Sequence, residues 1–104
     1  MSDLKQQWIE ALRSGNYLQG KNWLADDMGT NVYYCCLGVL CEIAELDKYI
    51  EGSVVYYDGR DQTPPQWLTF DVGLTQVQVS SLVYMNDDEN KTFEEIADWI
   101  EENV

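Results

Sequence analysis

Residues 35–46 constrain the fold of this chain more than any other segment, because they are apolar on nearly every side of a helix. The run reads CCLGVLCEIAEL. Only Gly38, Glu42 and Glu45 break it, and their spacing places them on one narrow stripe of a helix. A helix that is apolar almost all round belongs in the interior of a protein. The sequence therefore predicts a central helix over residues 35–46.

The N-terminal segment predicts a second helix, near residues 2–14, with apolar residues recurring at helical spacing. Ser2 is the expected N-cap, and Gly15 suits the left-handed position that follows a helix. Residues 16–31 are rich in turn-forming residues and are predicted to be a loop. Further along, Pro65 is typical of the first turn of a short helix.

Two more helices are predicted near residues 75–86 and 92–103. Residues 76–80 alternate like a strand, but helical spacing continues after them, so we favour a helix. Both predicted helices begin with the side-chain pattern of a capping box. The pairs are Thr75 with Gln78 and Thr92 with Glu95.

Strand-forming residues at 32–34 and 54–57 predict a small sheet of two or three strands. The expected fold class is therefore α+β, an α-rich single globular domain over residues 1–104 with about four helices. The predicted core consists of Leu4, Trp8, Leu12, Leu37, Leu40, Cys41, Ala44, Leu82, Phe93, Ile96 and Ile100.

The charge of the chain is strongly negative, with 19 acidic residues against 6 basic ones and a net charge of −13. Residues 1–25 hold two acids and three bases, so the negative charge belongs almost entirely to residues 26–104. Such a chain repels phosphate groups, which disfavours direct binding of nucleic acid. It attracts basic protein surfaces instead. The simpler alternative is that the charge serves solubility only.

The sequence contains no apolar run long enough to span a membrane and no secretory signal at its start. We therefore expect a cytoplasmic protein that does not engage a membrane. In that reducing compartment the three cysteines, Cys35, Cys36 and Cys41, are expected to be buried packing residues without disulfides.

Catalytic equipment is sparse. The chain has no histidine, which removes the commonest general base and the commonest metal ligand. Three cysteines at this spacing do not complete a structural zinc site. The acidic run at 87–90 lacks the spacing of a calcium-binding loop, so a solvated turn is expected there. We predict no enzymatic activity, no cofactor and no metal.

The last eighteen residues hold eight acids against one lysine, together with a clean apolar stripe. The helix predicted over residues 92–103 places five of these acids on the face opposite the stripe, with Trp99 at the border between the two. A ring surrounded by charge is typical of an interface anchor, although a Trp that covers the core edge is the plainer alternative. The predicted partner-binding residues are Asp87, Asp88, Glu89, Glu94, Glu95, Asp98, Trp99, Glu101 and Glu102.

Three stretches together resemble a family of small, uncharacterised proteins encoded by tailed phages and prophages. They are WIEALRSGNYLQG at 8–20, YCCLGVLCE at 34–42, and MND at 85–87 followed by TFEEIADWI at 92–100. The resemblance spans most of the chain except residues 47–70. It implies a phage origin and assigns no catalytic residue. Where the family often carries a basic, glycine-rich linker, this chain has NWLADD at 22–27, which makes it more acidic than that family.

These features suggest a small acidic binding protein that engages a host protein with a basic surface and modulates its activity. A sharper version is nucleic-acid mimicry, as in anti-restriction or anti-CRISPR inhibitors. The alternative is a structural or self-associating phage protein.

Overall fold

The α+β class is confirmed by a computed structural model, which describes residues 3–104. Five helices are described: α1 (Leu4–Arg13), α2 (Cys36–Ile43), α3 (Gln66–Asp71), α4 (Gln76–Asp87) and α5 (Phe93–Asn103). Five strands are described as well: β1 (Leu18–Gln19), β2 (Ala25–Asp27), β3 (Val32–Tyr34), β4 (Lys48–Glu51) and β5 (Val54–Tyr57). The sheet is thus larger than the two or three strands predicted.

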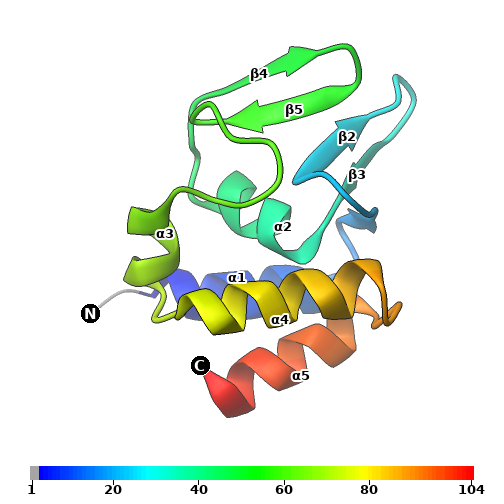
Figure 1. Cartoon of the computed structure of the whole chain (residues 1–104). Coiled ribbons are helices and arrows are strands. Elements are labelled where there is room, and N and C mark those ends of the chain that lie inside the picture. Colours follow the sequence, from blue (N-terminus) through cyan, green and yellow to red (C-terminus); the bar gives the residue numbers. More distant parts are fainter. Residues whose placement is uncertain (1–2) are drawn as a thin grey trace.

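The sheet has the strand order β1-β3-β2-β5-β4. All neighbouring pairs are antiparallel except β1 with β3, which run parallel. The two strands that the sequence predicts, β3 and β5, do not pair with each other, because β2 lies between them. The sheet stands above a layer formed by α1, α4 and α5, and α2 lies between the two (Figure 1).

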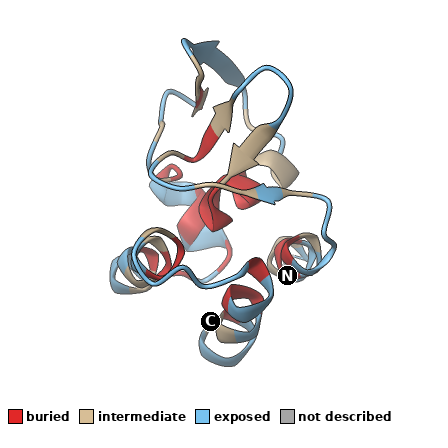
Figure 2. Ribbon diagram, turned by 90° about the vertical axis from the view of Figure 1, so that its right-hand side faces the viewer, coloured by how far each residue is buried: buried red, intermediate tan, exposed pale blue. Residues whose placement is uncertain are grey.

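Helix α2 is central, as predicted. Its residues from Cys36 to Cys41 are all buried. Gly38 belongs to the predicted polar stripe, yet it lies closer to a neighbouring segment than any other described glycine: a Cβ on Gly38 would lie 1.7 Å from the carbonyl oxygen of Leu24. The indole Nε1 of Trp8 donates a hydrogen bond to the carbonyl of Cys36 at 2.8 Å, which ties α1 to the start of α2. Figure 2 shows the buried residues gathered where the helices and the sheet face one another.

Two predicted boundaries need correction. Helix α2 ends at Ile43 rather than near residue 46, with Ala44 as its C-cap, because Glu45 adopts a left-handed backbone at φ 58°. Residues 16–31 are not simply a loop, since they contain β1 and β2. The helix over 75–86 and both capping boxes are confirmed. Gly15 is left-handed, at φ 78°.

Most of the predicted core is confirmed. Leu4 and Ala44 are only half-buried and pack against its edge, whereas the other nine residues are buried. The predicted cap at Ser2 lies outside the described residues, and α1 begins after Asp3. Within residues 3–104 no helix combines the length and the hydropathy needed to cross a membrane.

Candidate functional site

Helix α5 carries most of the residues that the sequence singles out. Its start is fixed by reciprocal hydrogen bonds: Thr92 Oγ1 accepts from the amide of Glu95 at 3.1 Å, and Glu95 Oε1 accepts from the amide of Thr92 at 2.9 Å. The buried stripe of the helix consists of Phe93, Ile96, Ala97 and Ile100. Because this stripe packs on the core, the opposite side of α5 keeps one orientation toward solvent.

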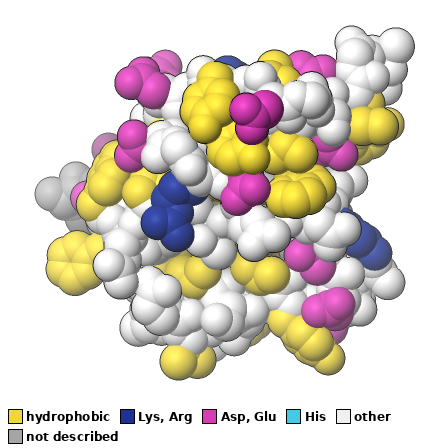
Figure 3. Space-filling view, turned by 45° about the horizontal axis from the view of Figure 1, so that its top comes forward, with side chains coloured by type: hydrophobic (Ala, Val, Ile, Leu, Met, Phe, Trp, Pro, Cys, Tyr) yellow, Lys and Arg dark blue, Asp and Glu magenta, His cyan; other side chains and the backbone are white. Residues whose placement is uncertain are grey.

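That opposite side is the acidic face, a name used here for Glu94, Glu95, Asp98, Glu101 and Glu102. All five residues are exposed. Trp99 is half-buried and packs against the core, which agrees with the border position predicted for it. Other acidic side chains lie away from α5, and Figure 3 shows several of them among hydrophobic side chains.

Arg13, at the end of α1, forms ion pairs with two of the five carboxylates of the acidic face. Its Nη2 lies 2.6 Å from Asp98 Oδ1 and 2.9 Å from Glu101 Oε1. The hydrogen bonds with Glu101 and Asp98 raise the pKa of the Arg13 guanidinium. Glu94 and Glu102 form no ion pair within residues 3–104. The sequence did not reveal this bridge, because it depends on how α1 packs against α5.

Glu95 is held by the capping box rather than by a cation. The hydrogen bond from the backbone of Thr92 lowers the pKa of its carboxyl, and the nearby charge of Lys91 acts in the same direction. The carboxylates left for an outside partner on α5 are therefore mainly those of Glu94 and Glu102.

The acidic residues of the turn before α5 differ in their exposure to solvent. Asp88 and Glu89 are exposed. Asp87 is half-buried, and its Oδ1 accepts hydrogen bonds from the amide of Asn22 at 3.2 Å and from Asn86 Nδ2 at 2.9 Å. Asp87 therefore points toward the protein rather than toward a partner. No group of three or more potential metal ligands is found among residues 3–104.

Asn86 is a buried polar residue that sequence reasoning treated only as part of a helical pattern. Its Oδ1 accepts from Gln19 Nε2 at 2.8 Å and from the amide of Cys36 at 3.3 Å, and its Nδ2 donates to the carbonyl of Gly20 at 2.8 Å. One amide group thus joins α4, β1 and the start of α2. The available signal in the sequence was a polar residue at a position where helical spacing predicts an apolar, buried one.

The three cysteines are free and buried. Burial raises the pKa of the Cys35 thiol to about 12 and raises the pKa values of Cys36 and Cys41 as well. Cys35 Sγ also accepts a hydrogen bond from the amide of Gly38 at 3.3 Å, so this thiol caps α2. Protonated, buried thiols are poor nucleophiles, which favours the predicted packing role.

A pocket of about 460 Å³ opens at the start of α2. It is lined by Asn22, Trp23, Cys35, Cys36, Leu37, Gln62, Thr63, Val83, Asn86 and Asp87. Its volume lies in the range of small-molecule sites. Among these described lining residues Asp87 is the single carboxylate and both thiols are protonated, so the lining offers no acid–base pair.

Comparisons with known proteins bear on the two halves of the chain differently. No curated protein and no solved structure matches the chain. A family model described as a domain of unknown function (DUF8296) matches residues 1–53, which include α1, four of the strands and α2 but not α5. This match covers half of the chain, and the protein therefore belongs to the DUF8296 family.

Proposed function

We propose that this protein is a small acidic binding module that engages a basic surface of another protein and modulates its activity. The observation that carries the proposal is the acidic face of α5, which is exposed along one side of a helix whose other side is anchored in the core. A basic partner is steered toward such a surface by long-range attraction. The resemblance to phage-encoded proteins suggests that the partner is a protein of the bacterial host.

Nucleic-acid mimicry is the sharper form of the proposal. From Glu94 to Glu102 the helix rises about 12 Å. Over that length one DNA strand carries roughly three to four phosphates. The acidic face holds five carboxylates and one bound guanidinium, which leaves four net negative charges. Its charge density therefore matches that of a DNA strand.

The test reverses the unbridged charges and leaves the bridged ones intact. Glu94→Lys with Glu102→Lys changes the net charge by four units without touching the Arg13 pairs. Asp47→Lys with Asp71→Lys is the matched control, because both residues are exposed and lie outside α5. Capture of proteins from bacterial lysate is measured for each variant at low and high salt. We expect the α5 variant to lose a salt-sensitive partner that the control retains.

If the two variants captured the same proteins equally well, the acidic face would serve solubility only, and mimicry would be excluded. With a purified partner, Trp99→Ala is expected to raise the dissociation rate and to leave the association rate unchanged, because the ring contributes short-range contact and no charge. Dissociation that is unchanged in a folded Trp99→Ala variant would assign Trp99 to the core edge alone.

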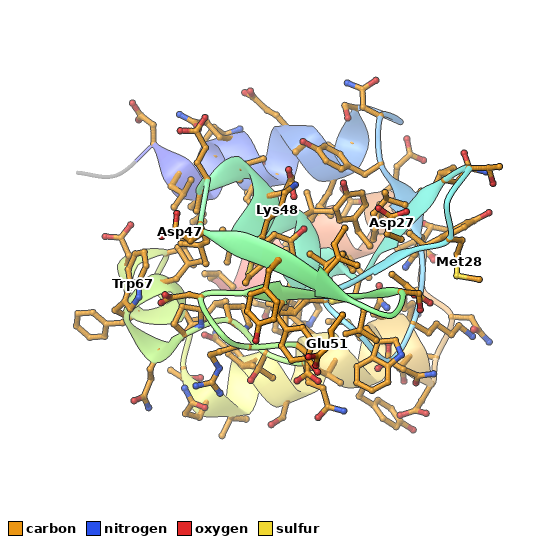
Figure 4. The ribbon with its side chains drawn as sticks, turned by 90° about the horizontal axis from the view of Figure 1, so that it is seen from above. Asp27, Met28, Asp47, Lys48, Glu51 and Trp67 are labelled. Atoms are coloured by element: carbon orange, nitrogen blue, oxygen red, sulfur yellow. The ribbon has the colours of Figure 1, made fainter. Side chains whose placement is uncertain are left out.

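A second candidate function is self-association, favoured by an exposed aromatic patch. Phe70 is 82% exposed and Trp67 56% exposed on α3, and Val77 on α4 is 76% exposed. Figure 4 shows Trp67 projecting at the margin of the molecule. The adjoining groove, of about 470 Å³, has no ionisable residue among its described lining residues. Sedimentation of the parent and of Phe70→Ser tests this: self-association predicts a salt-insensitive dimer that the variant loses.

A further inference from the structure

Strand β4 forms one edge of the sheet, and all four of its residues are exposed. Figure 1 shows it as the outermost strand, with β5 beside it. The strand at the opposite edge, β1, has only two residues. An edge strand presents backbone N–H and C=O groups that no neighbouring strand engages, and these groups can pair with a strand of another molecule.

The backbone groups of Lys48 and Ile50 face the free edge of β4. In an antiparallel pair, successive residues direct their backbone groups alternately toward the neighbouring strand and away from it. The amide of Asp58 donates to the carbonyl of Asp47 at 2.7 Å. This bond shows that the odd-numbered residues of the segment face β5, so residues 48 and 50 face away from it.

The hydrogen bonds of β5 agree with this assignment. Tyr57 exchanges both of its backbone bonds with Arg60, at 2.7 and 2.9 Å. The carbonyl of Ser53 accepts a bond from the amide of Asp27 in β2 at 2.6 Å. The odd-numbered residues of β5 therefore face away from β4, and residues 48 and 50 lie opposite two of them. The N–H and C=O groups at 48 and 50 thus have no partner among residues 3–104 and are open to a further strand.

Strand β4 lacks the features that commonly protect an edge from pairing. It contains no proline, and its register with β5 runs without a bulge. Its lysine does not present a bare charge to an added strand, because Lys48 Nζ lies 2.8 Å from Glu42 Oε1. Tyr49 and Ile50 are 54% and 52% exposed, so apolar surface accompanies the open backbone groups.

A hollow of about 290 Å³ lies beside β4, on the face of the sheet that carries Ile50. Its apolar lining includes Ile50, Val55 and Val32. A residue opposite Ile50 on an added strand would have its Cβ about 5 Å from that of Ile50, on the same face. Such a residue meets the hollow at the margin that Ile50 forms, and an aliphatic side chain suits the apolar lining.

The other face of β4 favours a basic side chain. Figure 4 shows Glu51 and Lys48 on opposite sides of the strand. Glu51 is exposed and forms no ion pair within residues 3–104. On the same face Tyr49 stacks on Tyr56, with ring centroids 4.9 Å apart. A lysine or arginine opposite Glu51 would pair with its carboxylate beside the Tyr49 ring.

A second copy of the chain fits this edge less well than a basic segment does. The antiparallel register centred on Tyr49 places Glu51 opposite Asp47 of the copy, and the one centred on Lys48 places two lysines together. The register centred on Ile50 extends into the turn after β4. Each chain also carries a net charge of −13. Charge therefore favours a basic partner.

We propose that the edge of β4 binds an extended segment of a partner protein, which joins the sheet as an additional antiparallel strand. Lys48 and Ile50 supply four backbone hydrogen bonds, an aliphatic side chain meets the hollow beside Ile50, and a basic side chain pairs with Glu51. In this mode of recognition the backbone bonds give affinity and the side-chain contacts give specificity. The inference goes beyond the proposed function, since this surface includes no residue of α5.

The experiment alters the ligand and leaves the protein unchanged. The blocked peptide Lys-Val-Thr-Val-Lys is titrated at low salt while backbone amide shifts are followed by NMR, and the largest shifts are expected at residues 48–51. Methylating the backbone nitrogens of both valines removes donors that face β4, which is expected to raise Kd about tenfold. Methylating the threonine nitrogen is the matched control: that N–H faces away from β4, so Kd stays within about twofold.

A pair of protein variants tests the charge that selects the segment. Glu51→Gln keeps the shape of the side chain and is expected to raise Kd about threefold at low salt, an effect that high salt removes. Asp71→Asn removes an exposed carboxylate outside the sheet and should leave Kd unchanged.

Equal effects of the two kinds of methylation, or a larger effect at threonine, would overturn the inference. Equal Kd values for the Glu51→Gln and Asp71→Asn variants would also overturn it. Concentration-dependent shifts at β4 without peptide would show that a second copy occupies the edge instead. Shifts confined to α5 would overturn the inference too, while the proposed function would stand.

Discussion

Helix α2 is buried on almost every side, whereas helix α5 buries one stripe and presents carboxylates to solvent on the other. The two helices therefore place different limits on their sequences. Packing fixes nearly every side chain of α2, but only the inner stripe of α5. The family match includes α2 and ends well before α5. A function carried by the acidic face thus need not be shared by the family, whereas α2 itself lies in the matched half.

The largest effect is expected at Gly38. A methyl group there would lie 1.7 Å from the carbonyl oxygen of Leu24, so either α2 or the segment that leads into β2 must move. We expect Gly38→Ala to lower the free energy of unfolding by more than about 4 kcal/mol. Chemical denaturation measures the change. Gly15→Ala is the control: it meets no atom within 4 Å and bears only the cost of its left-handed backbone, about 1–2 kcal/mol.

Equal losses for the Gly38 and Gly15 variants would show that close packing does not govern α2. The comparison with α5 would then lose its physical basis.

Leu40 tests the core of α2 by removal rather than by addition. Its side chain is fully buried. Truncating it to Ala should lower the free energy of unfolding by roughly 2–5 kcal/mol, through lost burial and the cavity left behind. On α5, Glu102→Ala removes an exposed side chain and should change it by less than about 0.5 kcal/mol. A loss below about 1 kcal/mol for Leu40→Ala would contradict a central position for α2.

The sequence predicted α2 and α5 for related reasons. Apolar residues nearly all round residues 35–46 and a capping box before an amphipathic stripe are both local patterns. Strands β1 and β2 were not predicted, because they have only two and three residues, too few to show the alternation of a strand. They exist because distant segments pair with them: β1 pairs with β3, and β2 with both β3 and β5.

The candidate sites divide in the same way. The acidic face follows from helical spacing and was predictable, but the Arg13 bridge to Asp98 and Glu101 depends on tertiary packing. Most of the sheet was hidden as well, because the sequence indicated only two of its five described strands. Local patterns thus predicted the main helices and two strands, whereas the remaining strands and the contacts between elements depend on pairing of distant segments.

Alkaline pH should lower the stability of the fold in part through the buried thiols of α2. Burial raises the pKa of Cys41 far above its ordinary value of 9.0. Above that pH the unfolded chain loses the thiol proton while the folded protein keeps it, so stability falls as pH rises. Each such thiol contributes about 1.4 kcal/mol per pH unit. Between pH 9 and pH 10, Cys41→Ala should therefore lose about 1 kcal/mol less than the parent in denaturation experiments. Parallel pH profiles for the two proteins would refute the buried, protonated state of this thiol.

Acidic pH should affect the start of α5 instead, with the smallest effect of the series. The hydrogen bond from the Thr92 backbone lowers the pKa of Glu95 below its ordinary value of 4.5. The folded protein then binds fewer protons than the unfolded chain near that pH. The carboxylate therefore stabilises the fold above pH 4.5, and this contribution is lost as pH falls through the folded pKa.

Glu95→Gln separates the charge of this cap from its hydrogen bond. Glutamine still accepts from the amide of Thr92, so α5 should keep its start and its helix content. The variant should lack only the part of the acid destabilisation that comes from Glu95, seen as a slightly flatter profile of thermal midpoint against pH from 6 to 3. Alanine at the same position should lower the midpoint at every pH, because it removes the acceptor itself. If the glutamine and alanine variants behaved alike, the capping bond would not hold α5, and the fixed orientation of the acidic face would need another cause.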